Sequence, residues 1–392
     1  MAHNAAELIE TPILDGDLLR QTAIREIRAQ IVTLPSVRAH RLSNTEFSHR
    51  EFVLVRVRLA NGIEGIGEAA VLGGPRWAEE SVESIQAAVT RYLAPALLDC
   101  PAARPAEAAL RMAKAAFRNN AAKGAVETAI YDALAQTLDV PLTLLFGGAL
   151  RDRVPVLWAL ASGDAEQEVE EARAKLAARE HRDFKIKLGF ASPEDDLRRL
   201  RKLRDEVPEM RRLIVDVNQA WSEADCRRFL PALQELRVDL IEQPLPGDDF
   251  EGMARVAAQS PIPLMVDEAA FTHREITRAG TMGCGSVYSL KLVKSGGLRA
   301  LTQAARVAES SGMELYGGCL LEGSIGAAAH LAVFATLPRL PWGCEHFGPR
   351  LHVSEIVKDP LVIEDFHLCV PQGPGLGVHL DEDRLRDALR PS

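Results

Sequence analysis

The chain has 392 residues, of which 47% are hydrophobic and 5% aromatic, a composition typical of a folded globular protein. This composition excludes a disordered or fibrous protein. Lys and Arg number 46 against 55 Asp and Glu, so the formal net charge of -9 provides no cationic surplus for nucleic acid or an anionic membrane. The length predicts two or three domains, or one large barrel with an attached domain.

Targeting and redox features point to the cytoplasm. The first forty residues lack the pattern of a signal peptide, and no apolar run approaches the roughly 18 residues of a membrane span. We therefore expect a cytoplasmic protein without a membrane partner. The six cysteines are scattered singly, without a CxxC pair, and are interpreted as reduced side chains: Cys100, Cys226, Cys284, Cys319, Cys344 and Cys369.

The N-terminal third has the pattern of an α+β domain. Residues 1–27 have weak periodicity and are interpreted as an arm or as the approach to a first strand. The sequence EFVLVRVRLANGIEGIGEA alternates apolar and polar residues on both sides of Asn61 and Gly62, which predicts an antiparallel hairpin with a type I′ turn. Ala-rich segments over residues 78–139 have apolar spacings of three and four and predict about three helices.

After residue 155 the pattern changes to short apolar segments that alternate with helical stretches. The segments recur about every 24 to 29 residues, the length of one βα unit. The helix after the second segment is predicted to begin with Ser192 as N-cap and Pro193 at its first position. Eight such units predict a (β/α)₈ TIM-like barrel. The predicted strands begin near Val156, Phe184, Leu213, Val238, Ile262, Ser286, Met313 and Leu340.

The predicted domain organisation has three parts. Residues 1–150 form the α+β domain, and residues 151–352 form the barrel. Residues 353–392 contain the Pro/Gly-rich stretch PQGPGLGV, which does not fit another βα unit. We expect this last segment to return to the N-terminal domain.

Three carboxylates follow successive predicted strands, where barrels place their functional residues. Asp216, Glu242 and Asp267 are separated by 26 and 25 residues, so they are expected at the same height on three neighbouring strands. Three carboxylates without a thiolate or imidazole partner suit a hard cation, Mg²⁺ or Mn²⁺. The alternative is that each acid caps the helix after its strand.

Lysines are predicted on both sides of this carboxylate cluster. Lys185 and Lys187 lie two residues apart, so both side chains share one strand face, predicted to be the barrel interior. Lys291 is expected across the barrel mouth. Such a pair could move a proton on either face of a substrate, with mutual repulsion lowering the lysine pKa values. Alternatively, the lysines only neutralise the carboxylates.

Further polar residues follow the same strands. Asn218, Glu268 and Lys294 lie next to the carboxylates and lysines and are predicted to contact the substrate or the primary site residues. Glu322 and Glu345 follow the last two predicted strands. For these two, a helix cap and a substrate contact are equally compatible with the sequence.

These motifs together resemble the muconate lactonizing subgroup of the enolase superfamily, over almost the whole chain from about Ala29 to Arg390. The segments KIK, DVNQAW, IEQPL, VDEA and SLKLVKSGG are similar to the subgroup's lysine and metal-ligand motifs, in the same order. The segments HRDFKIKLG, YGGCLLEGSIG, WGCEHFGP and GPGLGVHLDED resemble bacterial muconate cycloisomerases more narrowly.

The resemblance implies roles for the predicted site residues. One Mg²⁺ or Mn²⁺ would be bound by the three carboxylates. Lys187 would be the main proton donor, with Lys185 as its electrostatic neighbour and Lys291 on the far face of the substrate. Glu345 would be a further site residue.

The resemblance also implies how the site is closed and assembled. The N-terminal domain, completed by the C-terminal segment, would cap the barrel mouth. A loop over residues 71–80, with Leu72 and Trp77, and a loop near residues 43–49 would close over a small dicarboxylate substrate. Members of the family are commonly octamers, so a homo-oligomer is expected.

The implied reaction is the reversible lactonization of cis,cis-muconate in aromatic catabolism. Chloromuconate cycloisomerase is an alternative, since Trp77 resembles those enzymes while Lys294 and Phe347 resemble the non-halogenated type.

A dipeptide or N-acylamino acid epimerase or racemase and an o-succinylbenzoate synthase share the two-lysine site. Dipeptide epimerases carry Asp-x-Asp on strand eight, where this chain has Cys344-Glu345-His346. Acid-sugar dehydratases would use a His/Asp base in place of Lys291. Outside enzymology, the competing hypothesis is a non-catalytic barrel that keeps a metal only for stability.

Overall fold

The computed structural model describes residues 15–42, 45–189 and 191–390. The prediction of an arm over residues 1–27 lies partly outside these ranges; within them, a short helix α1 (Gly16–Gln21) precedes the first strand. No helix in the described ranges is long and apolar enough to cross a membrane.

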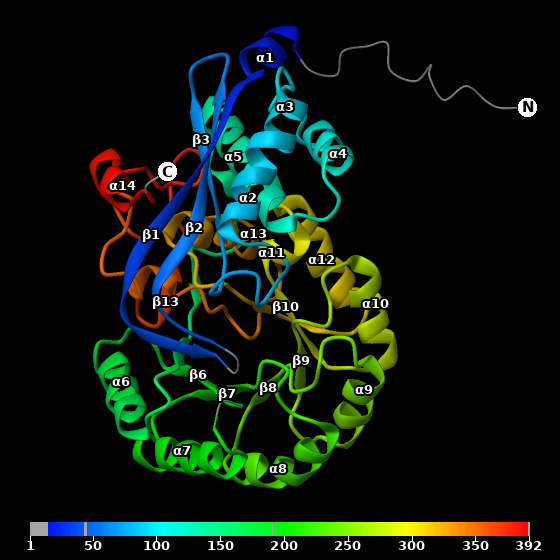
Figure 1. The fold of residues 1–392 in the computed structure, drawn as a ribbon, viewed down its shortest axis with the longest axis vertical. Helices are drawn as coiled ribbons and strands as arrows, with labels where there is room; N and C mark the ends of the chain where they lie inside the picture. Colours follow the sequence, from blue (N-terminus) through cyan, green and yellow to red (C-terminus); the bar gives the residue numbers. More distant parts are fainter. Residues whose placement is uncertain (1–14, 43–44, 190, 391–392) are drawn as a thin grey trace, which may run out of the picture.

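The N-terminal domain contains an antiparallel sheet in the order β1-β2-β3, seen at the upper left of Figure 1. The hairpin predicted from the alternating sequence is formed by the second and third strands. The long first strand was not predicted. The strands are β1 (Ile24–Leu42), β2 (Thr45–Leu59) and β3 (Glu64–Ala70).

The predicted type I′ turn between β2 and β3 is wrong. Such a turn needs positive φ at both central residues, but only Gly62 has it, with φ of 86°, and Asn61 does not. The Gly62 N–H donates to the Leu59 carbonyl at 3.0 Å, and the Leu59 N–H donates to the Ile63 carbonyl at 2.9 Å. This is a three-residue loop that ends in a left-handed glycine. The Asn61 side chain stabilises it by accepting from the Ile63 N–H at 3.0 Å.

The three helices predicted after the hairpin are confirmed. The longest of them, α5, packs directly against β3, because two glycines of that strand allow a close approach. A Cβ at Gly65 would lie 2.1 Å from the Ala129 carbonyl oxygen, and one at Gly67 would lie 2.0 Å from that of Ala125. The first helical stretch comprises α2 (Val82–Ala88), η1 (Val89–Leu93) and α3 (Ala94–Leu97), followed by α4 (Pro105–Ala115) and α5 (Asn120–Thr137).

The predicted (β/α)₈ barrel is confirmed. Seven parallel strands run in sequence order from β5 to β11, and helices surround them in the lower half of Figure 1. The first residue of each strand lies within two positions of the predicted start. The prediction relied on apolar segments, and these are the segments that are buried in the barrel. The strands are β5 (Trp158–Leu160), β6 (Asp183–Lys187), β7 (Arg212–Asp216), β8 (Leu240–Glu242), β9 (Leu264–Val266), β10 (Val287–Leu290) and β11 (Glu314–Gly317).

The eighth strand, predicted from Leu340, is reduced to one bridged residue. Cys344 makes parallel bridges with Gly317, the last residue of β11, and with Val156, which precedes β5. The Cys344 N–H donates to the Pro155 carbonyl and the Glu345 N–H donates to the Gly317 carbonyl, both at 2.9 Å. These bonds join the two edges of the seven-stranded sheet and close the barrel.

The outer helices begin where the sequence indicates. In α7 the Ser192 hydroxyl accepts from the Asp195 N–H, with Pro193 at the first position, as predicted. A buried ion-pair network joins this helix to its neighbour, because Arg199 binds both Glu168 and Asp196. The barrel helices are α6 (Ala165–Ala177), α7 (Pro193–Glu206), α8 (Glu223–Glu235), α9 (Phe250–Gln259), α10 (His273–Met282), α11 (Leu292–Ser295), α12 (Leu298–Ser310) and α13 (Ser324–Phe334).

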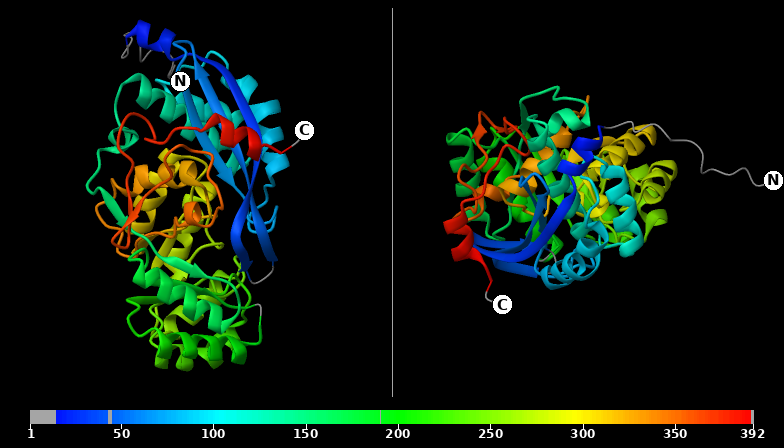
Figure 2. Two further views of the ribbon diagram at one scale, coloured as in Figure 1. Left: turned by 90° about the vertical axis from the view of Figure 1, so that its left-hand side faces the viewer. Right: turned by 90° about the horizontal axis from the view of Figure 1, so that it is seen from above.

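The C-terminal segment contacts both the barrel and the N-terminal sheet, as the left view of Figure 2 shows. Its hairpin, β12 (Ile363–Glu364) and β13 (His367–Cys369), pairs with β4 (Arg153–Pro155). Beyond α14 (Glu382–Ala388), Leu389 bridges to Val32 of β1. The domain boundaries at residues 150 and 352 stay predictions.

Candidate active site

The lysines of β6 lie inside the barrel, against carboxylates of the neighbouring strands. Strand β6 pairs with β7 so that Lys187 is opposite Asp216, and β7 pairs with β8 so that Asp216 is opposite Glu242. The Lys187 Nζ lies 2.5 Å from Asp216 Oδ2. The Lys185 Nζ lies 2.5 Å from Glu242 Oε2 and 4.0 Å from Asp216 Oδ2, and it also pairs with Glu345.

A second pair of lysines surrounds Asp267 on the other side of the barrel. The Lys291 Nζ lies 2.5 Å from Asp267 Oδ2, and the Lys294 Nζ donates to Asp267 Oδ1 and to its carbonyl, both at 3.1 Å. The ammonium of Lys291 also lies 4.2 Å from the ring centroid of Trp77. The capping loop therefore covers Lys291 with an aromatic ring, an arrangement that stabilises a cation.

The additional residues predicted at the strand ends join the same network. The Asn218 amide donates to Glu268 Oε1 at 3.1 Å, and its oxygen lies 3.5 Å from the Lys187 Nζ. Leu72 is buried in the loop that carries Trp77. In the loop predicted near residues 43–49, positions 43 and 44 lie outside the described residues.

Glu345, which follows the bridged residue Cys344, accepts hydrogen bonds from three donors. The Tyr316 hydroxyl donates to Glu345 Oε2 at 2.9 Å, and the Cys319 N–H donates to Oε1 at 2.9 Å. Lys185 supplies the third contact. Both carboxylate oxygens are therefore used inside the protein. Of the two possibilities that the sequence left open for Glu345, a helix cap is wrong.

The expected lowering of the lysine pKa values is wrong for Lys187 and Lys291. Burial alone would lower the pKa of Lys187, but Asp216 and the other carboxylates hold it above its usual value. Asp267 does the same for the pKa of Lys291, against the effect of burial. Repulsion between the lysines is outweighed by attraction to carboxylates. Lys294, for which no pKa shift was predicted, differs from them, since burial lowers its pKa to about 8.

The carboxylates respond in opposite ways to this environment. Burial, followed by repulsion from Asp216, raises the pKa of Glu242 well above its usual value. Burial would also raise the pKa of Asp267, but Lys291 and Lys294 lower it below its usual range. Burial and the charge of Asp267 raise the pKa of Glu268 to about 7. The site therefore holds more buried negative charge than its lysines fully compensate.

The donor chemistry of Asp216, Glu242 and Asp267 fits a hard divalent cation. All three carboxylates are buried at the carboxyl ends of neighbouring strands, and oxygen ligands of this kind are those that Mg²⁺ and Mn²⁺ prefer. Glu242 Oε2 accepts no hydrogen bond, although the Lys185 Nζ lies 2.5 Å away, so this contact is an ion pair without hydrogen-bond geometry.

Among the residues that the structure describes, a different trio has ligand atoms within 4.8 Å of one another: Glu322, His330 and His346. His330 is already engaged, since its Nδ1 contacts the Gly326 carbonyl at 2.8 Å and its Nε2 accepts from the Leu292 N–H at 3.0 Å. With neither nitrogen free, this trio fits a metal less well than the carboxylates do. Glu322 accepts the Leu320 N–H with both oxygens.

Comparisons with known proteins agree with this geometry. The chain matches the family model "Mandelate racemase / muconate lactonizing enzyme, N-terminal domain" over residues 26–147 and "Enolase C-terminal domain-like" over residues 167–384. It is 41% identical to muconate cycloisomerase 1 of Pseudomonas putida over 364 residues, covering 92% of this chain and 97% of that protein. The chain belongs to the muconate lactonizing enzyme family of the enolase superfamily.

Other members of the family are similar over the same extent. A chloromuconate cycloisomerase of Pseudomonas putida is 37% identical over 367 residues, which cover 94% of this chain and 99% of that protein. The crystal structure of muconate lactonizing enzyme from Pseudomonas fluorescens complexed with muconolactone has a TM-score of 0.93 and 40% identity, covering 94% of this chain and all of that one. The match therefore includes both the barrel and its cap.

The structure adds site residues to this family member that the sequence did not single out. Gln243 is fully buried, and its Oε1 accepts the N–H groups of Asp267 at 2.9 Å and Ala269 at 3.2 Å. Its φ is 32°, in the left-handed region, where a non-glycine residue is strained and often functional. Tyr316 lies under Lys185, with the ammonium 4.8 Å from its ring. Gln243 follows Glu242 in the IEQPL motif, which was the only available signal.

Proposed function

We propose that this protein is a muconate cycloisomerase, which interconverts cis,cis-muconate and muconolactone by adding one carboxylate to a carbon–carbon double bond. The observation that carries the proposal is the placement of Lys187 and Lys291 on opposite sides of a buried carboxylate cluster. In addition, both carboxylate oxygens of Glu345 accept hydrogen bonds from the protein. The relatives named muconate cycloisomerase support it.

The reaction balances without an external reagent. In the lactone-forming direction, an oxygen of one carboxylate forms a bond to a carbon of the diene. The electron pair of that double bond moves into the other carboxylate, which becomes an enediolate. A proton from a lysine then forms the new C–H bond at the α-carbon, and the same lysine recovers the proton in reverse. We assign the proton donor to Lys187.

Each named residue has a distinct part in this proposal. Asp216, Glu242 and Asp267 would hold one Mg²⁺ or Mn²⁺, which stabilises negative charge on a substrate carboxylate when bound. Lys291 remains a cation on the far face and stabilises the developing charge, and its position under the Trp77 ring keeps water away from it. Lys185, between Glu242 and Glu345, maintains positive charge behind the donor lysine.

The hydrogen bonds that Glu345 accepts from the protein argue against the epimerase alternative. An epimerase of dipeptides needs a free carboxylate on strand eight to hold an α-ammonium group. Here both oxygens of Glu345 accept hydrogen bonds from the protein. The neighbouring His346 is buried, and burial holds its pKa well below the usual value, so it is a neutral group.

Chloromuconate is the second candidate substrate. Trp77 supports it, since this ring reaches the site and its sequence context resembles that class; relatives named chloromuconate cycloisomerase match with 36% to 39% identity. A spectrophotometric assay separates the candidates. The ultraviolet absorbance of cis,cis-muconate should fall as its conjugated diene is consumed, and faster than that of 3-chloromuconate. A dipeptide epimerised much faster than either compound is converted would contradict the proposal.

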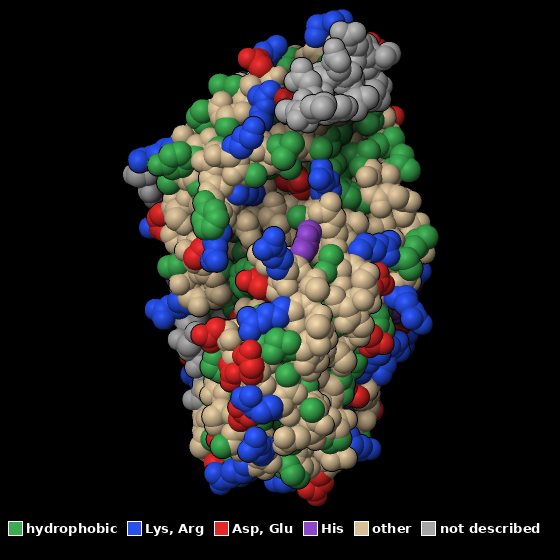
Figure 3. Space-filling view, turned by 90° about the vertical axis from the view of Figure 1, so that its right-hand side faces the viewer, with side chains coloured by type: hydrophobic (Ala, Val, Ile, Leu, Met, Phe, Trp, Pro, Cys, Tyr) green, Lys and Arg blue, Asp and Glu red, His purple; other side chains and the backbone are tan. Residues whose placement is uncertain are grey.

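The proposed setting is a cytoplasmic homo-oligomer, an octamer by family resemblance, that acts on a small dicarboxylate. The face shown in Figure 3 carries acidic and basic side chains interspersed, without a continuous basic band that would attract nucleic acid. Light scattering of the purified protein would measure the number of subunits, and a mass of one chain would contradict the oligomer.

A further inference from the structure

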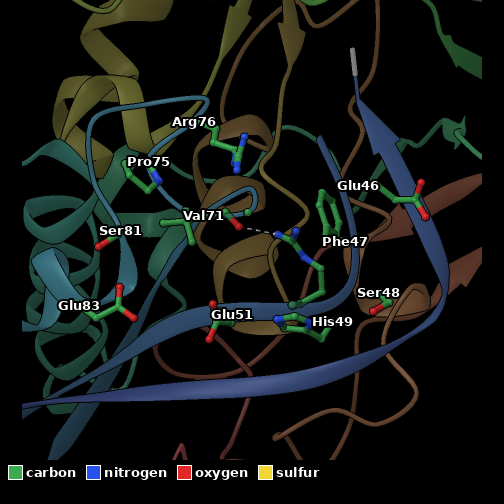
Figure 4. Close-up of a pocket in the computed structure, with 13 residues that line it drawn as sticks. Glu46, Phe47, Ser48, His49, Glu51, Val71, Pro75, Arg76, Ser81 and Glu83 are labelled. Carbon is green, nitrogen blue, oxygen red and sulfur yellow. Dashed lines mark hydrogen bonds between the residues drawn. The ribbon is translucent and has the colours of Figure 1, made fainter. Parts of the chain in front are cut away.

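A pocket with a volume of about 580 Å³ lies between β2 and the loop that follows β3 (Figure 4). Its walls include Phe47 and Arg50 from β2, and Val71 and Arg76 from the loop. None of the barrel lysines or carboxylates lines it. The family resemblance implies that the two segments that form it cover the barrel mouth, which would place the pocket beside the entrance to the active site.

Arg50 is a buried cation in the wall of this pocket, with only 2% of its surface exposed. Its Nη2 donates to the carbonyls of Val71 at 3.1 Å and Leu320 at 2.6 Å, and its guanidinium lies 4.7 Å from the Phe47 ring centroid. Its Nε has no hydrogen-bond partner. Burial lowers the pKa of Arg50 to about 10, so it stays protonated at neutral pH.

No acid within the described residues forms an ion pair with Arg50. Glu322 and Glu68 act on it at longer range. Both use their oxygens elsewhere, since Glu322 accepts the Leu320 N–H and Glu68 accepts the N–H groups of Gly323 and Gly326. A buried charge without a counter-ion is costly, which indicates that Arg50 is kept for an anionic partner.

The acids in the pocket wall are paired with arginines that do not line the pocket. Glu46 binds Arg41 at 2.6 Å. Arg390 binds Glu83 at 2.5 Å and Glu51 at 3.5 Å. Two outside arginines therefore offset two of the three negative charges, and with Arg50 and Arg76 the four guanidinium groups exceed these three acids by one.

The remaining charge of the pocket is positive. Arg76 is exposed and, like Arg50, has no acidic partner among the described residues. Arg50 also connects the pocket to the active site, because the carbonyl that it binds belongs to Leu320, next to Cys319, whose N–H donates to Glu345. Two guanidinium groups without an acidic partner near one cavity suit a carboxylate, with which arginine forms charge-assisted hydrogen bonds.

We propose that Arg50 and Arg76 form a carboxylate subsite in this pocket, which binds one carboxylate of a dicarboxylate at the entrance to the barrel. The proposal rests on the proposed function only in taking a dicarboxylate as substrate. It assigns to the cap a role in binding that is separate from the chemistry at Lys187 and Lys291.

Calorimetric titration with adipate, a saturated six-carbon dicarboxylate, in the presence of Mg²⁺ tests the subsite without requiring turnover. Arg76→Gln should weaken adipate binding about three- to tenfold, the effect of one charge-assisted contact, and should leave hexanoate, with a single carboxylate, unchanged. The matched control is Arg91→Gln, an exposed arginine of the same domain that does not line the pocket, which should bind adipate as the unaltered protein does.

Substitution of Arg50 gives a second measurement. Arg50→Lys keeps the positive charge and should weaken adipate binding less than Arg50→Met, with urea unfolding used to confirm that each variant folds. If the Arg50 variants unfold, Arg76→Gln alone decides the question. Unchanged adipate affinity in Arg76→Gln, equal weakening for adipate and hexanoate, or no adipate binding by the unaltered protein would overturn the subsite. None of these results depends on whether the protein lactonizes muconate.

Discussion

Substitution of Gln243 by alanine should weaken metal binding although Gln243 is not itself a predicted metal ligand. Gln243 contacts no substrate in the proposed reaction, yet its side chain makes three hydrogen bonds in the buried turn after β8. It accepts from the N–H groups of Asp267 and Ala269, and its amide donates to the Leu245 carbonyl at 2.9 Å. Gln243 is therefore a positioning residue for Asp267.

The size of the effect follows from these three bonds. Gln243→Ala leaves two N–H groups and one carbonyl buried without partners, and each costs about 1–3 kcal/mol. Even at the lower end, the free energy of unfolding should fall by about 3 kcal/mol. Because the backbone of Asp267 loses its anchor, the affinity for Mn²⁺ should fall about 10- to 100-fold, as for other residues that orient metal ligands.

Calorimetric titration of chelator-treated protein with Mn²⁺ measures this affinity, and urea unfolding measures stability. Gln136→Ala is the matched control, since the Gln136 amide donates to Asp132 at 2.9 Å and to the Glu64 carbonyl at 3.3 Å in the cap. The control should lose stability and keep its Mn²⁺ affinity. A Gln243→Ala protein that folds and binds Mn²⁺ as tightly as the unaltered protein would refute the reasoning.

Three further outcomes are expected. Reaction in D₂O should place deuterium at the α-carbon, on the same face as the new C–O bond. Lys187→Ala should remove this protonation, and Lys291→Ala should be severely impaired. Proton NMR that shows the deuterium on the opposite face would transfer the donor role to Lys291. Trp77→Ala should lower kcat about two- to fivefold through the lost contact with Lys291, and Trp77→Phe less, whereas equal rates would contradict that role. Burial raises the pKa of Glu68 to about 8, so the folded state binds the extra proton and stability should decline as pH rises from about 4.5 toward 8. Urea unfolding of Glu68→Gln should show a smaller decline, and an identical pH profile would contradict this.

The barrel could be predicted because its pattern is local. Each βα unit repeats a buried segment and a helix start, and Ser192 with Pro193 is one such start that the structure confirms. The eighth strand could not be predicted in the same way, because Cys344 is held by hydrogen bonds to strands far away in the sequence. The turn at Gly62 was likewise decided by a side-chain bond from Asn61 that the dipeptide alone does not specify.

The positions of the site residues could be predicted, but their electrostatics could not. Spacing along the chain predicted Asp216, Glu242 and Asp267 at the ends of neighbouring parallel strands, and Asp216 is opposite Glu242 as expected. The equal height is wrong for Asp267, because Glu242 is opposite Met265 and Asp267 follows the end of β9. The pKa of Lys187 depends instead on which groups lie within a few ångströms. A strand pattern shows that Lys185 and Lys187 share a face, but it does not show that each ammonium meets a carboxylate.

The charge balance of the site connects the metal to the choice of substrate. Among the residues named at the strand ends, six buried carboxylates face four ammonium groups, so a dicarboxylate would meet repulsion when the carboxylates are ionised. A divalent cation on Asp216, Glu242 and Asp267 would cancel this excess of two negative charges and remove the repulsion. Metal binding and dicarboxylate binding should therefore be coupled, and the same cation that stabilises the enediolate would admit the substrate. The groups in this balance are Asp216, Glu242, Asp267, Glu268, Glu322 and Glu345 against Lys185, Lys187, Lys291 and Lys294.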